Sequence, residues 1–243
     1  MFGVQGRSVA AVTLRATMGR RRALLFALAP LILVLVTVML RLTQPDQADW
    51  PAKIVGIFAF TVVLPLTALI IGTSVLGAEI DDGSVVHLLA TPVPRQVVIG
   101  SKYLVAVLLT MAFVAVPELV AGLIATGGAT KLAMGLFAGA LAGSVIYNAI
   151  FVMLSAVTTR AIAIGLGYVL VWEALLGNFV SGARLLSAGQ YSLGIANSIA
   201  HDPGLNAEIG TATALVMGTI VTVAALVVAA RRLASFSLKG DAV

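Results

Sequence analysis

The sequence predicts an all-helical integral membrane protein with six transmembrane helices, and three observations lead to this fold class. Hydrophobic residues make up 60% of the 243 residues and charged residues only 10%, whereas a soluble domain averages about 45–50% and about 25%. Six apolar segments are each long enough to cross a bilayer as a helix. Basic residues gather in alternate connecting segments. These connections leave no room for a soluble domain, so residues 1–243 are expected to form a single membrane domain.

The first 22 residues are expected to form an amphipathic helix at the membrane surface. They contain five arginines, and Val9, Val12 and Ala16 recur among them at helical spacing. Such a helix buries its apolar face in lipid and points its arginines toward anionic head groups. The alternative is a solvated basic tail. A cleavable signal peptide is not expected, because no small-residue cleavage site follows the first apolar segment.

Six membrane spans follow, separated by polar or turn-forming residues. Pro65 predicts a kink in the second span, because proline lacks the N–H that would bond to the preceding turn. The first turns of the third span, beside Lys102, are expected to stand in the cytoplasm. The six spans are predicted at residues 23–40, 54–78, 97–126, 132–157, 162–179 and 211–230.

The segment 79–96, between the second and third spans, differs from the rest of the chain. Acidic residues end the second span, a glycine permits a sharp turn, and a serine can cap a short helix. Two prolines then force extended backbone before the third span begins. We therefore expect a short amphipathic helix, held between two breaks and lying across the membrane face; an ordinary acidic loop is the alternative. The interpretation rests on Glu79, Asp81, Asp82, Gly83, Ser84, Val85, Val86, Leu88, Leu89, Thr91, Pro92 and Arg95.

Small residues recur along the fourth span. Gly135, Gly139 and Gly143 follow one another at four-residue spacing and form a ridge that lets another helix approach closely. We expect this ridge to pack within the bundle. The seam of a dimer is the alternative.

Residues 180–210, between the last two spans, are too many for a simple turn and too mixed in character for a full crossing. We expect short helices that enter the outer leaflet as a partly re-entrant segment, which is tolerated where such backbone packs on protein. A solvated loop fits the composition equally well.

The basic residues also predict the orientation of the chain, since cytoplasmic loops carry an excess of lysine and arginine close to the spans. With the amino terminus inside, four basic residues fall outside: Arg41, Lys53, Lys131 and Arg184. The other eleven fall inside: Arg7, Arg15, Arg20, Arg21, Arg22, Arg95, Lys102, Arg160, Arg231, Arg232 and Lys239. Both termini and the segment 79–96 are thus expected to be cytoplasmic.

Two acidic residues lie within predicted spans. An ionised carboxylate in lipid costs several kcal/mol, so Glu118 and Glu173 should face protein or a water-filled cavity. Each is a candidate for the substrate path or for a proton relay. A protonated or hydrogen-bonded structural carboxylate is the alternative for both.

The sequence GAEIDDGSVVHLLATPVPRQVVIGSKYL, from residue 77 to residue 104, resembles the cytoplasmic loop of type-two ATP-binding-cassette (ABC) permeases. That loop has an acidic E-x-x-x-G-[ST] segment, an apolar helix, a [ST]-P-x-x-R segment and a lysine in the next span. The matching positions here are Glu79, Gly83, Ser84, Thr91, Pro92, Arg95 and Lys102. The span order, the basic amino-terminal helix and the re-entrant outer segment also match, so the resemblance covers nearly the whole chain.

This resemblance implies the permease subunit of an ABC transporter in the plasma (inner) membrane of a prokaryote, with export as the expected direction. In that family the loop is a coupling helix that docks on an ATPase subunit, and two permease chains form the pathway. The expected partners are cytoplasmic ATPase subunits, a second permease chain, identical or similar, and the lipid bilayer, but not nucleic acid.

Other functions are disfavoured by what the sequence lacks. No G-x-x-x-x-G-K-[ST] phosphate loop occurs, so we expect ATP hydrolysis from a separate polypeptide and no enzymatic activity in this chain. An intramembrane protease would need a buried serine–histidine pair or a metal cluster, but His87 and His201 are expected on opposite sides of the membrane. We expect no cofactor and no metal site. A proton-coupled secondary transporter that uses Glu118 and Glu173 is the main alternative.

Overall fold

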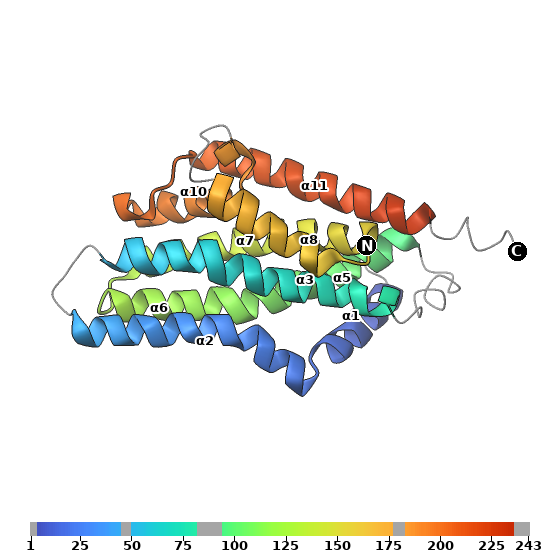
Figure 1. Cartoon of the computed structure of the whole chain (residues 1–243), viewed down its shortest axis with the longest axis horizontal. Coiled ribbons are helices and arrows are strands. Elements are labelled where there is room, and N and C mark those ends of the chain that lie inside the picture. Colours follow the sequence, from blue (N-terminus) through green and yellow to red (C-terminus); the bar gives the residue numbers. More distant parts are fainter. Residues whose placement is uncertain (1–3, 45–49, 82–93, 177–182, 236–243) are drawn as a thin grey trace, which may run out of the picture.

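The structure, a computed structural model, describes residues 4–44, 50–81, 94–176 and 183–235. Within these ranges the chain forms helices and turns and contains no strand, which confirms the all-helical prediction. The long helices run side by side along one axis (Figure 1). In chain order the elements are α1 (Val4–Thr17), α2 (Arg20–Thr43), η1 (Pro51–Gly56), η2 (Ala59–Val63), α3 (Leu64–Asp81), α5 (Arg95–Thr110), η3 (Met111–Ala115), α6 (Val116–Ala125), α7 (Thr130–Val157), α8 (Ala161–Gly167), η4 (Tyr168–Leu176), η5 (Ala183–Leu186), α10 (Ala188–Ala200), η6 (Pro203–Leu205) and α11 (Thr211–Ser235).

Five helical stretches in the described ranges are long and apolar enough to cross a membrane. They correspond to five of the six predicted spans and comprise Ala23–Thr43, Pro51–Gly77, Gln96–Ala125, Thr130–Val157 and Thr211–Leu233. The predicted span 162–179 coincides with α8 and η4, but its apolar helical part, Ala161–Glu173, is shorter than the others. Residues 177–179 of that span lie outside the described ranges. The sixth crossing therefore stays a prediction.

Two of the long helices widen into a π-helical turn directly before a proline. Pro65 follows η2, and Pro117 follows η3. Proline cannot donate to the carbonyl group one turn earlier, and its ring crowds that carbonyl. A wider turn accommodates this conflict without ending the helix. The structure thus has a π-helical turn shortly before Pro65, and the kink expected there stays a prediction.

Helix α7 lies at the centre of the fold and contacts α3, α6, α10 and α11. Its glycine ridge faces α10. A Cβ atom at Gly135 would lie 2.6 Å from the carbonyl oxygen of Ala196, and one at Gly139 would lie 2.7 Å from that of Ser192. Gly143 also abuts Ser192. Only glycine allows the two backbones to come this close, so the ridge packs within the bundle as predicted.

Residues 183–205 form the short helices that the sequence predicts, and these pack on protein. The alternative of a solvated loop is wrong here, because α10 contacts α7 and α11 and buries most of its residues. Leu205 of η6 is fully buried, and its side chain occupies the space beside Gly56 of η1. The expected depth of these helices in the outer leaflet stays a prediction.

The amino-terminal helix α1 packs beside α5 and α3. Gly19 separates it from α2 with extended backbone (φ −56°, ψ 137°), so the two helices meet at an angle (Figure 1). Thr13 and Thr17 are buried, whereas Val12 is 66% exposed. An exposed apolar side chain at the edge of a membrane bundle suits contact with lipid. A helix is therefore present, but it ends at Thr17, and Arg20, Arg21 and Arg22 belong to α2 instead. Its position at the membrane surface stays a prediction.

Candidate functional site

The two helices that flank residues 82–93 form one packed unit. Helix α3 ends at Asp81, α5 begins at Arg95, and the two helices contact each other. One buried apolar cluster joins them to α2, α7 and α11, and it includes Ile71, Val75, Leu76, Val98, Ile99, Phe26, Val152, Ala156, Ala229 and Leu233. Because protein interiors are closely packed, a displacement of one flanking helix is transmitted to the other.

Lys102 adds a polar link between the same two helices. Its side chain is only 1% exposed, and its Nζ donates a 2.7 Å hydrogen bond to the backbone carbonyl oxygen of Val75 in α3. Lys102 thus lies inside the bundle, and the expectation that the first turns of the third span stand in the cytoplasm stays a prediction. Burial of an ammonium group is costly unless hydrogen bonds satisfy it. The packing of α5 against α3 brings the carbonyl oxygen of Val75 within reach of Lys102 and so supplies one such bond.

Most residues of the predicted coupling segment lie outside the described ranges: Asp82, Gly83, Ser84, Val85, Val86, Leu88, Leu89, Thr91 and Pro92. Glu79 and Asp81 fall in the last turn of α3. Arg95 is the first residue of α5, as expected for the start of the third span. The structure therefore defines the supports on both sides of the segment, and the short helix between them stays a prediction.

The ends of the helices separate the described basic residues into two groups. Figure 1 shows that α3 and α11 end at one end of the bundle, whereas α2 ends and α7 begins at the other. Arg231 and Arg232, in the last turns of α11, are exposed at the first end. Arg41 and Lys131 belong to the second end. The basic residues of these helix ends thus lie at the two ends of the bundle to which the predicted orientation assigns them.

Glu118 in α6 is fully buried, and neither of its carboxyl oxygens has a hydrogen-bond partner in the described part of the chain. One turn further along the same helix, Gly122 packs against Ala133 of α7. The side chain therefore faces protein, as expected. An ionised carboxylate without a partner would cost several kcal/mol in this environment.

Glu173 in η4 is instead held by four hydrogen bonds. Its carboxylate accepts the hydroxyl groups of Tyr168 (2.8 Å) and Ser187 (2.5 Å). It also accepts the backbone N–H groups of Ala188 (2.9 Å) and Gly189 (3.3 Å). These are the first N–H groups of α10 and have no partner within that helix. A carboxylate here satisfies them and complements the positive end of the helix dipole, so Glu173 attaches α10 to η4.

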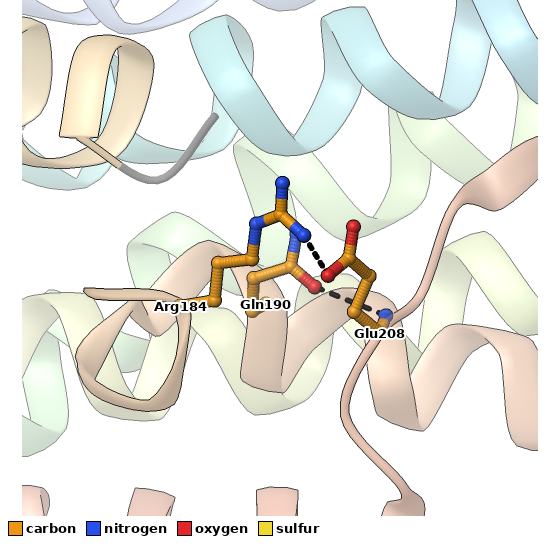
Figure 2. A network of polar contacts seen from close by, with 3 residues as sticks. All are labelled: Arg184, Gln190 and Glu208. Carbon is orange, nitrogen blue, oxygen red and sulfur yellow. Dashed lines mark hydrogen bonds and ion pairs between the residues drawn. The ribbon is translucent and has the colours of Figure 1, made fainter. Parts of the chain in front are cut away.

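Further polar contacts surround the start of α10. Ser187 is the N-cap residue, and its hydroxyl oxygen accepts the backbone N–H of Gln190 at 3.1 Å. Figure 2 shows Arg184 paired with the carboxylate of Glu208, while the side-chain oxygen of Gln190 accepts the backbone N–H of Glu208 at 3.3 Å. A cavity of about 110 Å³ borders Glu173, Ser187 and Gln190. Glu173 is thus found in a polar cluster beside a cavity, whereas the carboxyl oxygens of Glu118 have no partner in the described ranges.

Replacement by glutamine is expected to affect the stability of the protein differently at Glu173 and at Glu118. Glu173→Gln replaces a carboxylate oxygen by an NH₂ group that faces donors, and we expect it to cost about 1–3 kcal/mol of stability. Glu118→Gln keeps the shape of the side chain and breaks no hydrogen bond within the described chain, so we expect little change. Thermal unfolding of both variants in the same detergent measures the difference. Equal losses of stability would contradict this assignment.

Sequence reasoning missed the partners of Glu173. One local signal was present, because Ser187 and Gln190 form the S-x-x-Q pattern that marks the start of a helix. The bond from Ser187 to Glu173 joins positions 14 residues apart. No local pattern predicts that pairing, since it depends on how η4 lies against α10.

The family model described as ABC-2 family transporter protein matches residues 20–180, which is more than half of the chain. The match begins at the start of α2 and includes the segment 79–96 and both of its supporting helices. No curated protein matches the sequence.

Proposed function

The chain belongs to the ABC-2 family of transporter proteins, and on this premise we propose that it is the permease subunit of an ATP-driven exporter. A multi-pass helical protein of this family is a membrane transport subunit, and its helices satisfy their own backbone groups in lipid. The observation that carries the proposal is the contact between α3 and α5, the helices that precede and follow the segment 79–96. Apolar packing and the hydrogen bond of Lys102 join these two helices.

In this proposal, separate cytoplasmic ATPase subunits dock on the segment 79–96, whose residues 84–90 form the coupling helix. When ATP draws the ATPases together, they push this helix, and α3 and α5 carry the displacement into the bundle. The buried cluster supports this step, because it connects the two helices to α2, α7 and α11. ATP hydrolysis then resets the subunit.

A second permease chain, identical or similar, completes the pathway. Glu173 lies at the wall of a cavity, which supports the proposal that it lines this pathway. Glu118 is fully buried in the conformation described, so its contact with a substrate requires a second conformation of the bundle. The α8–η4 segment provides the sixth crossing together with residues outside the described ranges.

The protein is placed in the plasma membrane of a prokaryote, with both termini and the coupling segment in the cytoplasm. The basic residues at the end of α11 support this orientation, as does the predominance of lysine and arginine in the segments assigned to the inside.

A proton-coupled carrier is the second candidate, and one observation favours it. Glu118 is a buried carboxyl group whose oxygens have no partner in the described ranges, which is the kind of group that a proton relay uses. Glu173 supports this candidate less, because four donors already bind its carboxylate.

The orientation tests the proposal directly, because an ATPase can dock only on a cytoplasmic segment. The sequence contains no cysteine, so a single cysteine introduced at Ser84 or at Ala207 is the only thiol that a maleimide can label. We expect an impermeant maleimide to label Ala207→Cys in intact cells and Ser84→Cys only after permeabilisation. The unchanged chain is the control for background labelling. Labelling of Ser84→Cys in intact cells would contradict the proposal.

A further inference from the structure

A large cavity near the supports of the coupling segment lies between α2, α3, the end of α7 and α8. Its volume is about 700 Å³, which lies within the range of about 300–1,000 Å³ that is usual for ligand sites. Helix α8 forms one wall and is fixed there by Gly165, where a Cβ atom would lie 2.3 Å from Leu69 of α3. The cavity is therefore a feature of the packed chain.

The walls of this cavity divide into an apolar part and a polar part. Leu25, Ile70, Ile162 and Leu166 supply apolar surface, and all four side chains are partly exposed. The main polar part is the connection from α7 to α8, where Thr158, Thr159 and Arg160 line the cavity. The other polar lining residues donate their hydroxyl groups to carbonyl oxygens of their own helices; these are Thr73, Ser74 and Ser155. A ligand that fills both parts must be amphiphilic.

The charge of the lining specifies the polar part of such a ligand. Arg160 is exposed, and its guanidinium group has no hydrogen bond or ion pair within the described ranges. Among the lining residues that the structure describes, none is acidic. A guanidinium group beside threonine hydroxyls binds phosphate oxygens well, because it offers several N–H donors in a planar fork.

The position of Arg160 favours a lipid over a soluble anion as the ligand of this cavity. Arg160 follows the end of α7, so it lies where a membrane helix reaches the head-group region, and apolar wall residues continue from it along α8 and on the neighbouring α2. Basic pockets between membrane helices bind the head groups of anionic lipids. A soluble phosphate would leave the apolar walls uncovered, whereas an acyl chain covers them.

We propose that this cavity binds an anionic phospholipid, with its phosphate on Arg160 and an acyl chain between α2 and α8. The bound lipid lies against α3, which leads into the coupling segment. This inference concerns the chain alone, so it can fail while the proposed transport function holds, and the reverse is also true.

The test is a lipid titration of the full-length chain in detergent, followed by native mass spectrometry. The probes are dioleoyl phosphatidylglycerol, dioleoyl phosphatidylcholine and glycerol phosphate. We expect phosphatidylglycerol to bind in preference to the other two. Arg160→Gln should weaken this binding about fivefold, which corresponds to about 1 kcal/mol for one basic residue near the membrane surface.

A second variant blocks the apolar part without changing the charge. Gly77 lines the cavity and has open space around its Cβ position, so Gly77→Leu should fill the cavity and also weaken phosphatidylglycerol binding. The matched controls are Gly167→Leu, which has equally open space outside the lining, and Arg231→Gln, which removes an arginine elsewhere. Both controls should bind lipid like the unchanged chain.

Three results would overturn the proposal. One is a loss of affinity in Arg160→Gln no greater than in Arg231→Gln. Another is binding of glycerol phosphate as tight as that of phosphatidylglycerol, which would make this a soluble-anion site. The third is efficient disulfide formation between two copies of Ala163→Cys, which would mean that a second chain occupies the cavity.

Discussion

Replacing Gly83 by proline is expected to abolish stimulation of the partner ATPase by this chain. The predicted turn at Gly83 would connect the end of α3 to the proposed coupling helix, and proline fixes the backbone and removes an N–H group there. Glu79→Gln is expected to act in the same direction, because it removes a charge from the acidic side of the docking segment. Coupling between two sites is typically worth about 1–3 kcal/mol, so we expect hydrolysis in the assembled complex to fall by about 5- to 150-fold.

Two comparisons separate coupling from folding. Both variants lie at the end of the apolar span rather than inside it, so membrane insertion and thermal stability should be unchanged. Glu208→Gln is the matched control for Glu79→Gln, because it removes the same charge from the opposite end of the bundle. Normal ATPase stimulation by Gly83→Pro would remove the main functional claim.

Gly139→Leu is expected to detach α10 from α7 and to cause a severe loss of stability. A Cβ atom at this position would lie 2.6 Å from Phe60 Cζ and 2.7 Å from the backbone oxygen of Ser192. The phenyl ring can turn away, but the backbone of α10 can yield only if the helix moves. Overpacking of a core typically costs about 1–3 kcal/mol, and a full leucine side chain here should exceed that range.

The same substitution at Gly167 provides the control, since that position has open space. Gly167→Leu should leave the unfolding temperature unchanged or raise it slightly, because leucine favours helices more than glycine does. Thermal unfolding of the purified variants, together with protease sensitivity of the segment 183–210, measures the result. Equal stability of the two variants would contradict the assignment of Gly139 to the contact with α10.

Features set by local composition were predictable from the sequence. The long apolar segments appear as helices because their residues have few alternatives in lipid. The start of α5 at Arg95 was predictable because Pro94 precedes it, and the structure gives Pro94 extended backbone (φ −57°, ψ 132°). The ridge at Gly139 was predictable for a similar reason, since four-residue spacing places small residues on one helix face.

Features set by tertiary contacts were not predictable in the same way. Glu118 and Glu173 have similar apolar neighbours in the sequence, yet only Glu173 meets the amino-terminal end of another helix. The sequence predicts no partner for Lys102, but the approach of α3 gives its ammonium group a carbonyl partner inside the bundle. In both cases a partner distant in sequence decides the environment of the charge.

The central claim is that ATP hydrolysis by a partner subunit, and not a proton gradient, drives transport through this chain. The measurement is made in vesicles that contain the chain alone or the chain with the ATPase that copurifies with it. Accumulation of labelled drugs, lipids and peptides is followed, first with a pH gradient and then with ATP. We predict accumulation only when both the ATPase and ATP are present, whereas gradient-driven accumulation by the chain alone would contradict the account.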